Sequence, residues 1–267
     1  MVKSTNRYSK LIEEIFNKKY VKGVRDVAFE RIDLVSTAKK LKITLPKNLG
    51  DVIYTYRYRR PLPDGIRSVE PAHRSYRIRG TGSAIYRFVL GPEAAITPSA
   101  ERDETKIPDA TPGLIRRYAL GDEQALLARL RYNRLVDVFL QITCYSLQNH
   151  LRTQVTDLGQ VETDEIYVGV DRRGVHYIIP VQAKGGSDIL SAVQIEQDFA
   201  LCAEKFESLV CRAIAAQFLG PERIAMFELE PDPNGFAVVT REEHYLLVPE
   251  VELTKGELSA YQRRQFD

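Results

Sequence analysis

The most informative stretch of the sequence reads Gly159-Gln160-Val161-Glu162-Thr163-Asp164-Glu165-Ile166-Tyr167, followed shortly by Pro180-Val181-Gln182-Ala183-Lys184. Residues 163–170 and 175–183 each have the apolar, β-branched and aromatic content of a strand. The spacer between them ends in glycine, which is typical of a hairpin. The stretch therefore predicts two antiparallel strands.

Three polar residues of this hairpin suit phosphodiester hydrolysis. Gln182 and Lys184 share a face because side chains alternate along a strand, and a hairpin that folds back places Asp164 beside them. The Asp164 carboxylate, the Gln182 side-chain oxygen and the Ala183 carbonyl are hard oxygen ligands for Mg²⁺, with Mn²⁺ as a second choice. Lys184 is then expected to activate a water molecule or to neutralise developing negative charge.

The flanking sequence predicts further helices and strands. Residues 122–152 have a helical pattern with one break near Tyr132, and a second amphipathic helix is expected over 188–218. Further strands are expected at 224–229, 236–239 and 245–248. This order predicts an α+β or α/β domain with a mixed sheet flanked by helices.

The two motifs resemble those of the PD-(D/E)xK nuclease superfamily. Glu162-Thr163-Asp164 is similar to its first motif, and Gln182-Ala183-Lys184 is similar to its second. The resemblance covers about residues 122–230 and implies an αβββαβ core, a Mg²⁺-dependent endonuclease of the type II restriction kind, and a homodimer that cuts both strands of DNA.

The sequence departs from that family at Gln182, where the family usually has an acid. An amide oxygen coordinates a metal but brings no charge, so Glu162 and Glu165 are the nearest additional carboxylates. On the helix after the lysine, Gln194 resembles a glutamine that some relatives place in the site, and Asp137 is a candidate acid from the preceding helix. Both are equally compatible with an ordinary polar surface. A nuclease fold that has lost its activity and binds DNA sequence-specifically is the alternative function.

The distribution of charge divides the chain. Residues 1–90 carry 20 Lys+Arg and 8 Asp+Glu, a net charge of +12, whereas residues 91–267 have a net charge of −10. The sign changes across Gly91–Pro112, a proline-rich segment that reads as a linker between a DNA-binding domain (1–90) and the nuclease domain (113–267). The basic part predicts a polyanionic partner, most simply double-stranded DNA.

The basic segment has the pattern of a winged helix-turn-helix. Apolar residues at helical spacing indicate helices over 8–16 and 27–41, a third helix is expected over 45–58, and residues 76–88 read as a hairpin. The third helix would enter the major groove. An all-helical cap that packs on the other domain is the alternative. The basic residues expected at phosphates are Lys39, Lys40, Lys42, Lys47, Arg57, Arg59, Arg60, Arg77 and Arg79.

Composition narrows the class of protein. With 44% hydrophobic and 28% charged residues, the 267-residue chain has the composition of a folded soluble protein. It has no apolar run of about 18 residues and no secretory signal at its start, so we expect no membrane association. The three cysteines have no metal-type spacing and suit reduced thiols in a cytoplasm.

Overall fold

The structure, a computed structural model, describes residues 7–82, 84–118, 123–156, 158–185, 188–220 and 222–264. Within this part, the burial of Tyr58, Arg59 and Gly82 is not described. The chain divides into two compact units. The N-terminal unit comprises Met1–Ala94 with Val155–Gly159, and the C-terminal unit comprises Ala95–Gln154 with Gln160–Asp267.

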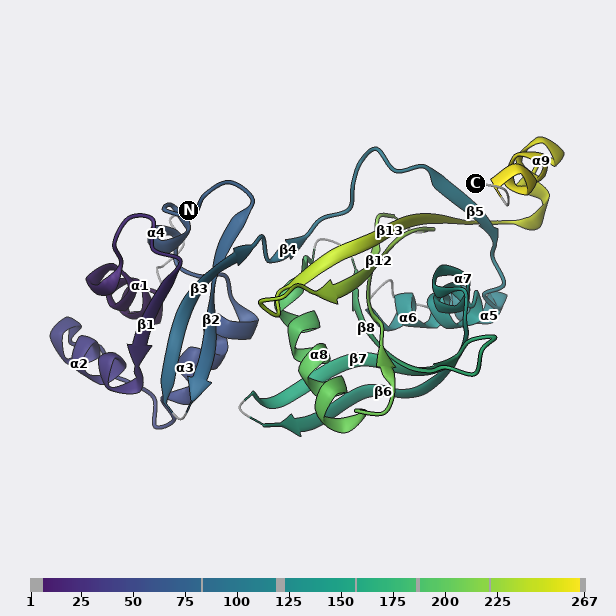
Figure 1. Ribbon diagram of the computed structural model, residues 1–267. Helices are drawn as coiled ribbons and strands as arrows, with labels where there is room; N and C mark the ends of the chain where they lie inside the picture. The colour runs from purple at the N-terminus through teal and green to yellow at the C-terminus, as the bar shows by residue number, and fades with distance from the viewer. Residues whose placement is uncertain are drawn as a thin grey trace. The chain divides into compact units, whose positions relative to one another are not determined.

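Short helices and a three-stranded antiparallel sheet, in the order β1-β3-β2, form the N-terminal unit (Figure 1). Its elements are α1 (Arg7–Lys19), β1 (Asp26–Glu30), α2 (Arg31–Leu41), α3 (Gly50–Tyr54), η1 (Thr55–Arg59), α4 (Asp64–Arg67), β2 (Arg74–Gly82) and β3 (Ile85–Pro92). An aromatic cluster fills its core, where Phe16 meets Tyr20, Tyr76 and Phe88 at ring-centroid distances of 4.8 to 5.2 Å.

The helix expected over 27–41 is wrong in its first part, which is strand β1. Val27 and Phe29 are buried while their neighbours are exposed, and this period of two is that of a strand with one covered face. Helix α2 starts only at Arg31. Glu30 and Asp33 form a capping box there, which satisfies backbone N–H groups of the first turn.

The third helix is also shorter than expected. It starts at Gly50 rather than near residue 45, because the Asn48 side chain accepts a hydrogen bond from the Gly50 N–H at 3.0 Å and turns the chain there. From Thr55 it continues as the wider turn η1. Val52, Ile53 and Tyr56 are buried, so this face of the helix packs on the core.

A mixed sheet with helices on both faces forms the C-terminal unit, as expected at the level of fold class. Among its described residues the sheet has eight strands in the order β5-β13-β12-β11-β8-β7-β6, with β10 also paired to β8. Its elements are β4 (Ala95–Ile96), β5 (Glu104–Pro108), α5 (Gly113–Tyr118), α6 (Glu123–Tyr132), α7 (Leu135–Leu140), β6 (Thr143–Val155), β7 (Gly159–Val170), β8 (His176–Lys184), β9 (Leu190–Ser191), α8 (Ala192–Lys205), β10 (Val210–Cys211), β11 (Ala213–Phe218), β12 (Arg223–Pro231), β13 (Ala237–Val248), η2 (Glu250–Glu252) and α9 (Lys255–Arg263).

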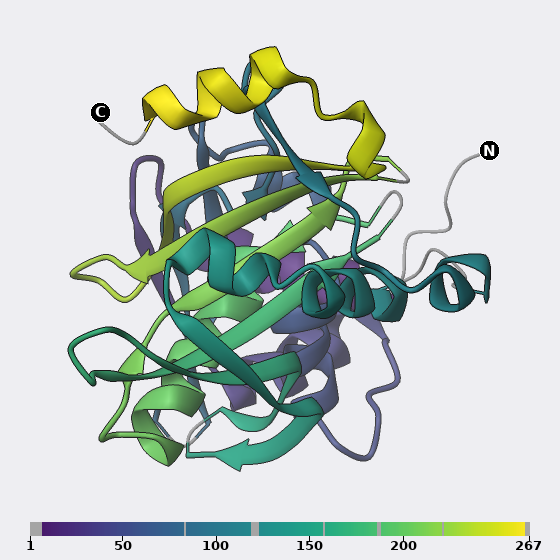
Figure 2. The same ribbon diagram turned by 90° about the vertical axis from the view of Figure 1, so that its right-hand side faces the viewer.

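Two hydrophobic clusters cover the two faces of this sheet. Leu126, Leu130 and Phe139 of α6 and α7 pack with Val181 and Ile214 on one face. On the other face, residues of α8 pack with neighbouring small residues of β11 and β12. Figure 1 shows α8 on one side of β8 and α6 and α7 on the other, and Figure 2 shows the same elements after a turn of 90°. The open end of the β7–β8 hairpin, where β7 begins and β8 ends, therefore lies between two helical layers.

Two of the expected long helices end early. The helical stretch over 122–152, whose first residue lies outside the described residues, breaks at Asn133–Arg134 and ends at Leu140. Gln141 then takes a left-handed conformation with φ 57°, and the chain continues as strand β6. The helix expected over 188–218 is α8 followed by strand β11.

The small apolar residues of β11 fit either element by pattern. They form a strand because they are buried between β8 and β12. The proline-rich segment 91–112 is likewise more than a linker, since β5 pairs in parallel with β13. No helix in the described parts of the chain is long and apolar enough to cross a membrane.

Candidate active site

The β7–β8 hairpin brings Asp164 to the end of β8, as the sequence predicts. The two strands are antiparallel, and Glu165 lies opposite Val181. The Asp164 Oδ2 atom accepts a hydrogen bond from the Ala183 N–H at 2.8 Å, and the Asp164 side chain is buried. This bond fixes one carboxylate oxygen beside the residues that precede and follow Ala183.

Strand β7 breaks its alternation at this point. Strict alternation would place Thr163 on the same face as Glu165. Instead, the Thr163 hydroxyl donates to Asp198 of α8 at 2.5 Å, whereas Glu165 binds Arg131 of α6, on the opposite side of the sheet. Such an irregularity, as in a β-bulge, changes the direction of a side chain next to a site. Here it directs Thr163 to α8 and Glu165 to α6.

Gln182 is held by α8. Its side chain is 1% exposed, and its Nε2 atom donates to Asp198 Oδ2 at 2.9 Å and to the Glu162 carbonyl at 3.3 Å. The Oε1 atom is buried and has no hydrogen-bond partner among the described residues. A buried acceptor without a partner costs free energy, so an unpaired oxygen here is a position where a cation or a donor would be stabilised.

Lys184 forms an ion pair with Glu123, the first described residue of α6. The distance between Lys184 Nζ and Glu123 Oε1 is 2.5 Å, and the lysine side chain is mostly buried. Burial raises the pKa of the Asp164 carboxyl, and the charge of Glu123 adds to this effect. The Ala183 N–H and the Lys184 ammonium oppose it. Asp164, Lys184 and Glu123 therefore interact as one electrostatic group.

His150 of β6 borders the same group. Its backbone is left-handed, with φ 48°, which is uncommon for a residue other than glycine and is found often at functional sites. The ring lies 2.8 Å from the Gln124 amide nitrogen and 3.7 Å from Glu162 Oε1. Glu162 itself is partly exposed and pairs with Arg152 at 2.9 Å. Glu162 thus lies at the rim of the site.

Glu165 belongs to a different environment. It is fully buried and accepts hydrogen bonds from Arg131 Nε at 2.9 Å and from the Ser146 hydroxyl at 2.5 Å. These contacts join α6, β6 and β7. The structure therefore uses Glu165 to hold these elements together, and the carboxylate that contacts Lys184 is that of Glu123.

The two residues that we expected from neighbouring helices do not contact the group. Asp137 accepts hydrogen bonds from Arg134 and from the Cys144 N–H, and so stabilises the turn between α7 and β6. Gln194 is only half-buried on α8. The residue of α8 that contacts Gln182 is Asp198, one turn further along.

Three residues of the site were not selected from the sequence, namely Glu123, His150 and Asp198. Only Asp198 has a signal in the sequence, because it lies on the apolar stripe of α8 between Ile195 and Cys202. A charged residue at such a position must have buried partners. Glu123 and His150 come from elements distant in sequence and have no such signal.

The donor set is compatible with a hard divalent cation. In the described parts of the chain, no group of three or more His, Cys, Asp or Glu side chains is arranged to hold a metal ion. Mg²⁺, however, is commonly held by one or two carboxylates, with water and substrate phosphate completing its shell. The Asp164 carboxylate and the Gln182 Oε1 atom, which has no partner among the described residues, have the chemistry for such a site.

The expected DNA-binding residues differ in how accessible they are. Exposed side chains are those of Lys39, Lys40, Lys42, Lys47 and Arg60. Arg57 and Arg79 are half-buried, and the side chain of Arg59 lies outside the described residues. The expectation that Arg77 contacts a phosphate is wrong. Arg77 is 4% exposed, and its Nη2 atom donates to the carbonyl groups of Pro92 and Glu93. It holds the end of β3 and cannot reach a phosphate.

Comparison with known proteins adds no relative to this picture, since no protein-family model, curated protein or solved structure matches the chain.

Proposed function

We propose that the chain is a divalent-cation-dependent DNA endonuclease with Asp164, Gln182 and Lys184 in its active site. The observation that carries the proposal is the arrangement of side chains at the open end of the β7–β8 hairpin, where β7 begins and β8 ends. There, Asp164 is fixed by the Ala183 N–H at 2.8 Å, and the buried Gln182 Oε1 atom has no hydrogen-bond partner among the described residues. Lys184 lies two positions after Gln182 on β8. The three residues belong to the two short motifs of the sequence.

The order of the elements supports the same proposal. Helices α6 and α7 precede β6, β7 and β8, and α8 then connects β8 to the parallel strand β11. This is the order αβββαβ that the resemblance to PD-(D/E)xK nucleases implies. The helices lie on both faces of the sheet, so the hairpin end is held from two sides.

The residues of the chain have separate roles in this proposal. Asp164 and Gln182 would hold the cation, which would polarise the phosphate and lower the pKa of an attacking water. Asp198 binds Gln182 Nε2 and so directs Oε1 away from α8, as outer residues orient metal ligands. Lys184 would exchange its contact with Glu123 for the scissile phosphate and neutralise the charge that develops there.

The N-terminal unit would dock on double-stranded DNA as a winged helix-turn-helix. Helices α2 and α3 precede the β2–β3 hairpin, in the order that this motif requires. The exposed lysines at the end of α2 and in the segment before α3 would meet phosphates. Cutting both strands would require two active sites, so we include a homodimer in the proposal.

The test compares plasmid cleavage by the wild-type chain and by Lys184→Ala, in Mg²⁺ and in Mn²⁺. We expect the variant to cut at least about 100-fold more slowly, because it loses the group that acts on the transition state. DNA binding in EDTA should be unchanged. The matched control is Lys205→Ala, which removes an exposed lysine that forms an ion pair with the adjacent Glu204. Equal cleavage by wild type and Lys184→Ala would refute the assigned site.

A DNA-binding protein without cleavage activity is the second candidate. The observation that favours it is the pairing of Lys184 with Glu123, which leaves its charge already neutralised. If the wild-type chain binds DNA and cuts none at any Mg²⁺ or Mn²⁺ concentration, this second function holds.

A further inference from the structure

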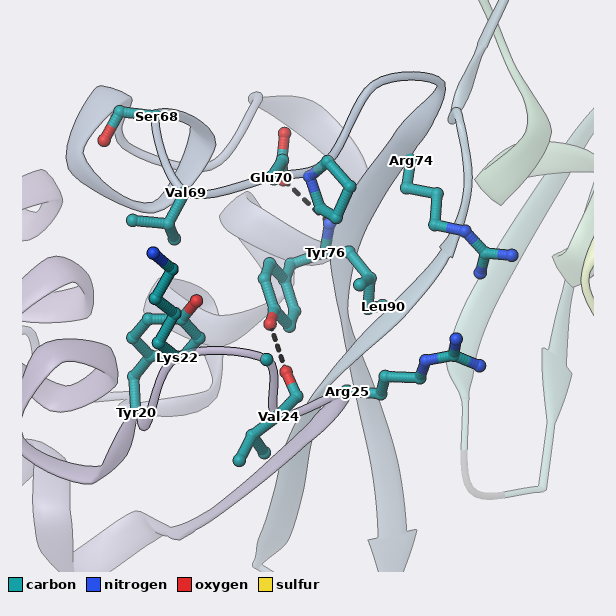
Figure 3. Close-up of a pocket in the computed structure, with 12 residues that line it drawn as sticks. Tyr20, Lys22, Val24, Arg25, Ser68, Val69, Glu70, Arg74, Tyr76 and Leu90 are labelled. Atoms are coloured by element: carbon teal, nitrogen blue, oxygen red, sulfur yellow. Dashed lines mark hydrogen bonds between the residues drawn. The ribbon is translucent and has the colours of Figure 1, made fainter.

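The N-terminal unit contains a pocket that the proposed nuclease activity does not use. It has a volume of about 790 Å³ and lies between residues 20–25, residues 68–76 and Leu90 (Figure 3). The first segment follows α1, the second joins α4 to β2, and Leu90 belongs to β3. Its size is within the range of small-molecule sites in proteins.

Aromatic and aliphatic side chains form the inner wall of the pocket. Tyr76 is central in Figure 3, with Leu90 beside it and Val24 below it. The Tyr76 hydroxyl donates to the Val24 carbonyl at 2.5 Å, so the polar end of this ring is already satisfied. Tyr20 lies nearly perpendicular to Tyr76, with the two ring centroids 6.3 Å apart. Tyr76 is only 4% exposed, so the half-buried Tyr20 is the ring that a flat group of a ligand would meet.

Glu70 supplies one hydrogen-bond acceptor at this wall. Its Oε1 atom accepts from the Tyr76 N–H at 2.7 Å, which fixes the carboxylate, and burial raises the pKa of the carboxyl. The second oxygen makes no hydrogen bond to the described residues. A fixed acceptor beside an apolar wall would recognise a ligand that carries an N–H group.

Three cations border the pocket, namely Lys22, Arg25 and Arg74. All three are exposed, and none forms an ion pair within the described part of the chain. The guanidinium groups of Arg25 and Arg74 extend on the same side of the pocket, and Lys22 lies on the other (Figure 3). Arg25 and Arg74, which form no ion pair with the described residues, favour an anionic group of a ligand at this side, above all a phosphate.

We propose that this pocket binds a nucleotide, with the base against Tyr20 and the phosphate at Arg25 and Arg74. Glu70 would accept a hydrogen bond from an N–H group of the base, as carboxylates do from cytosine N4. The same chemistry has two sources, a base turned out of duplex DNA or a free nucleotide. The site is independent of the cleavage chemistry, so nucleotide binding would remain if the proposed nuclease activity were refuted.

The test uses the full chain in EDTA, where cleavage cannot interfere. Calorimetric titrations use the four deoxynucleoside monophosphates and inorganic phosphate. A second series uses a duplex that carries one 2-aminopurine, whose fluorescence rises when the base leaves the stack. The chain has no Trp, so the protein adds no tryptophan background. The variants are Glu70→Gln and the double variant Arg25→Ala with Arg74→Ala, and Arg31→Ala is the control for an exposed arginine of the same unit.

We expect at least one nucleotide to bind more tightly than phosphate alone, or the 2-aminopurine signal to rise. The double variant should weaken this binding at least about tenfold, Glu70→Gln should weaken it less, and Arg31→Ala should leave it within about twofold. A rise in fluorescence with weak binding of free nucleotides would assign the site to an extruded base, and the reverse result would assign it to a free nucleotide. Absence of both signals, or equal effects of the double variant and Arg31→Ala, would overturn the proposal.

Discussion

Asp198 shows how one buried residue links stability to the site. It is fully buried on α8, and it binds the Thr163 hydroxyl and the Gln182 amide. Burial raises the pKa of its carboxyl to about 7, the charge of Asp164 adds to this, and the two hydrogen bonds oppose it. Asp198 therefore keeps its proton up to a higher pH in the native state than in the unfolded chain.

The sign of the resulting pH dependence follows from this raised pKa. The stabilising contribution is complete below the ordinary value of 3.8 and is lost as the pH rises through about 7. Asp198→Asn cannot ionise at this position. We expect its free energy of unfolding, relative to that of the wild type, to increase between pH 4 and 7 by no more than about 4 kcal/mol. Urea denaturation at pH 4.5, 6, 7 and 8 measures this difference.

Asp171→Asn is the matched control for this series. Burial raises the pKa of the Asp171 carboxyl. The N–H groups of Val175 and Arg173 and the Arg173 side chain lower it by more, so that the pKa falls to about 2. Its contribution is present above the ordinary pKa and is lost only in stronger acid. The stability of Asp171→Asn relative to the wild type should therefore be constant from pH 4.5 to 8. A constant difference for Asp198→Asn as well would contradict the assigned titration.

At the scale of elements, strand β7 packs closely against the turn that follows α7. A Cβ atom at Gly169 would lie 3.0 Å from the Cδ1 atoms of Ile142 and Ile179 and 3.4 Å from Cys144 Sγ. All three neighbours are buried in the core, so they have little room to move. The glycine allows β6, β7 and β8 to lie together at this position.

Gly169→Ala should consequently lower the free energy of unfolding by about 1–3 kcal/mol through overpacking. Gly113→Ala is the control, because a Cβ atom there meets no atom of the described residues within 4 Å. We expect its stability to remain within about 0.5 kcal/mol of the wild type. Thermal unfolding of both variants measures the effect, and equal melting temperatures would contradict the close packing at Gly169.

The elements also show where the sequence was sufficient. The β7–β8 hairpin was predicted because strand residues flank a turn that ends in glycine, and both strands are confirmed. Strands β6 and β11 were missed because their apolar residues also fit a helix, and only pairing with neighbouring strands decides between the two. Glu123 and His150 reach the site through α6 and β6, and no local pattern indicates that.

On the scale of the whole molecule, the charge is divided between the two ends of the sequence. Residues 1–90 have a net charge of +12 and the remaining residues a net charge of −10. If the basic part binds phosphates, affinity for DNA must fall as salt increases, because each phosphate contact releases a counterion.

Combined substitution of Lys39, Lys42 and Lys47 by alanine tests this charge argument. For one phosphate contact per lysine, the slope of log binding constant against log salt should become shallower by about 2–3. The control removes three exposed basic residues of the acidic part, Arg172, Lys205 and Lys255. Fluorescence anisotropy with a labelled duplex in EDTA gives both slopes, and equal slopes would exclude these lysines from the interface.

The sequence by itself determined the division of charge, the β7–β8 hairpin and the candidates Asp164, Gln182 and Lys184. These depend on composition and on neighbours within a few residues, which a linear pattern records. The tertiary structure decided that Glu165 and Arg77 are buried in structural contacts, and that Glu123, His150 and Asp198 border the site. Those outcomes depend on which elements pack together, because burial and partners arise between residues far apart in the chain.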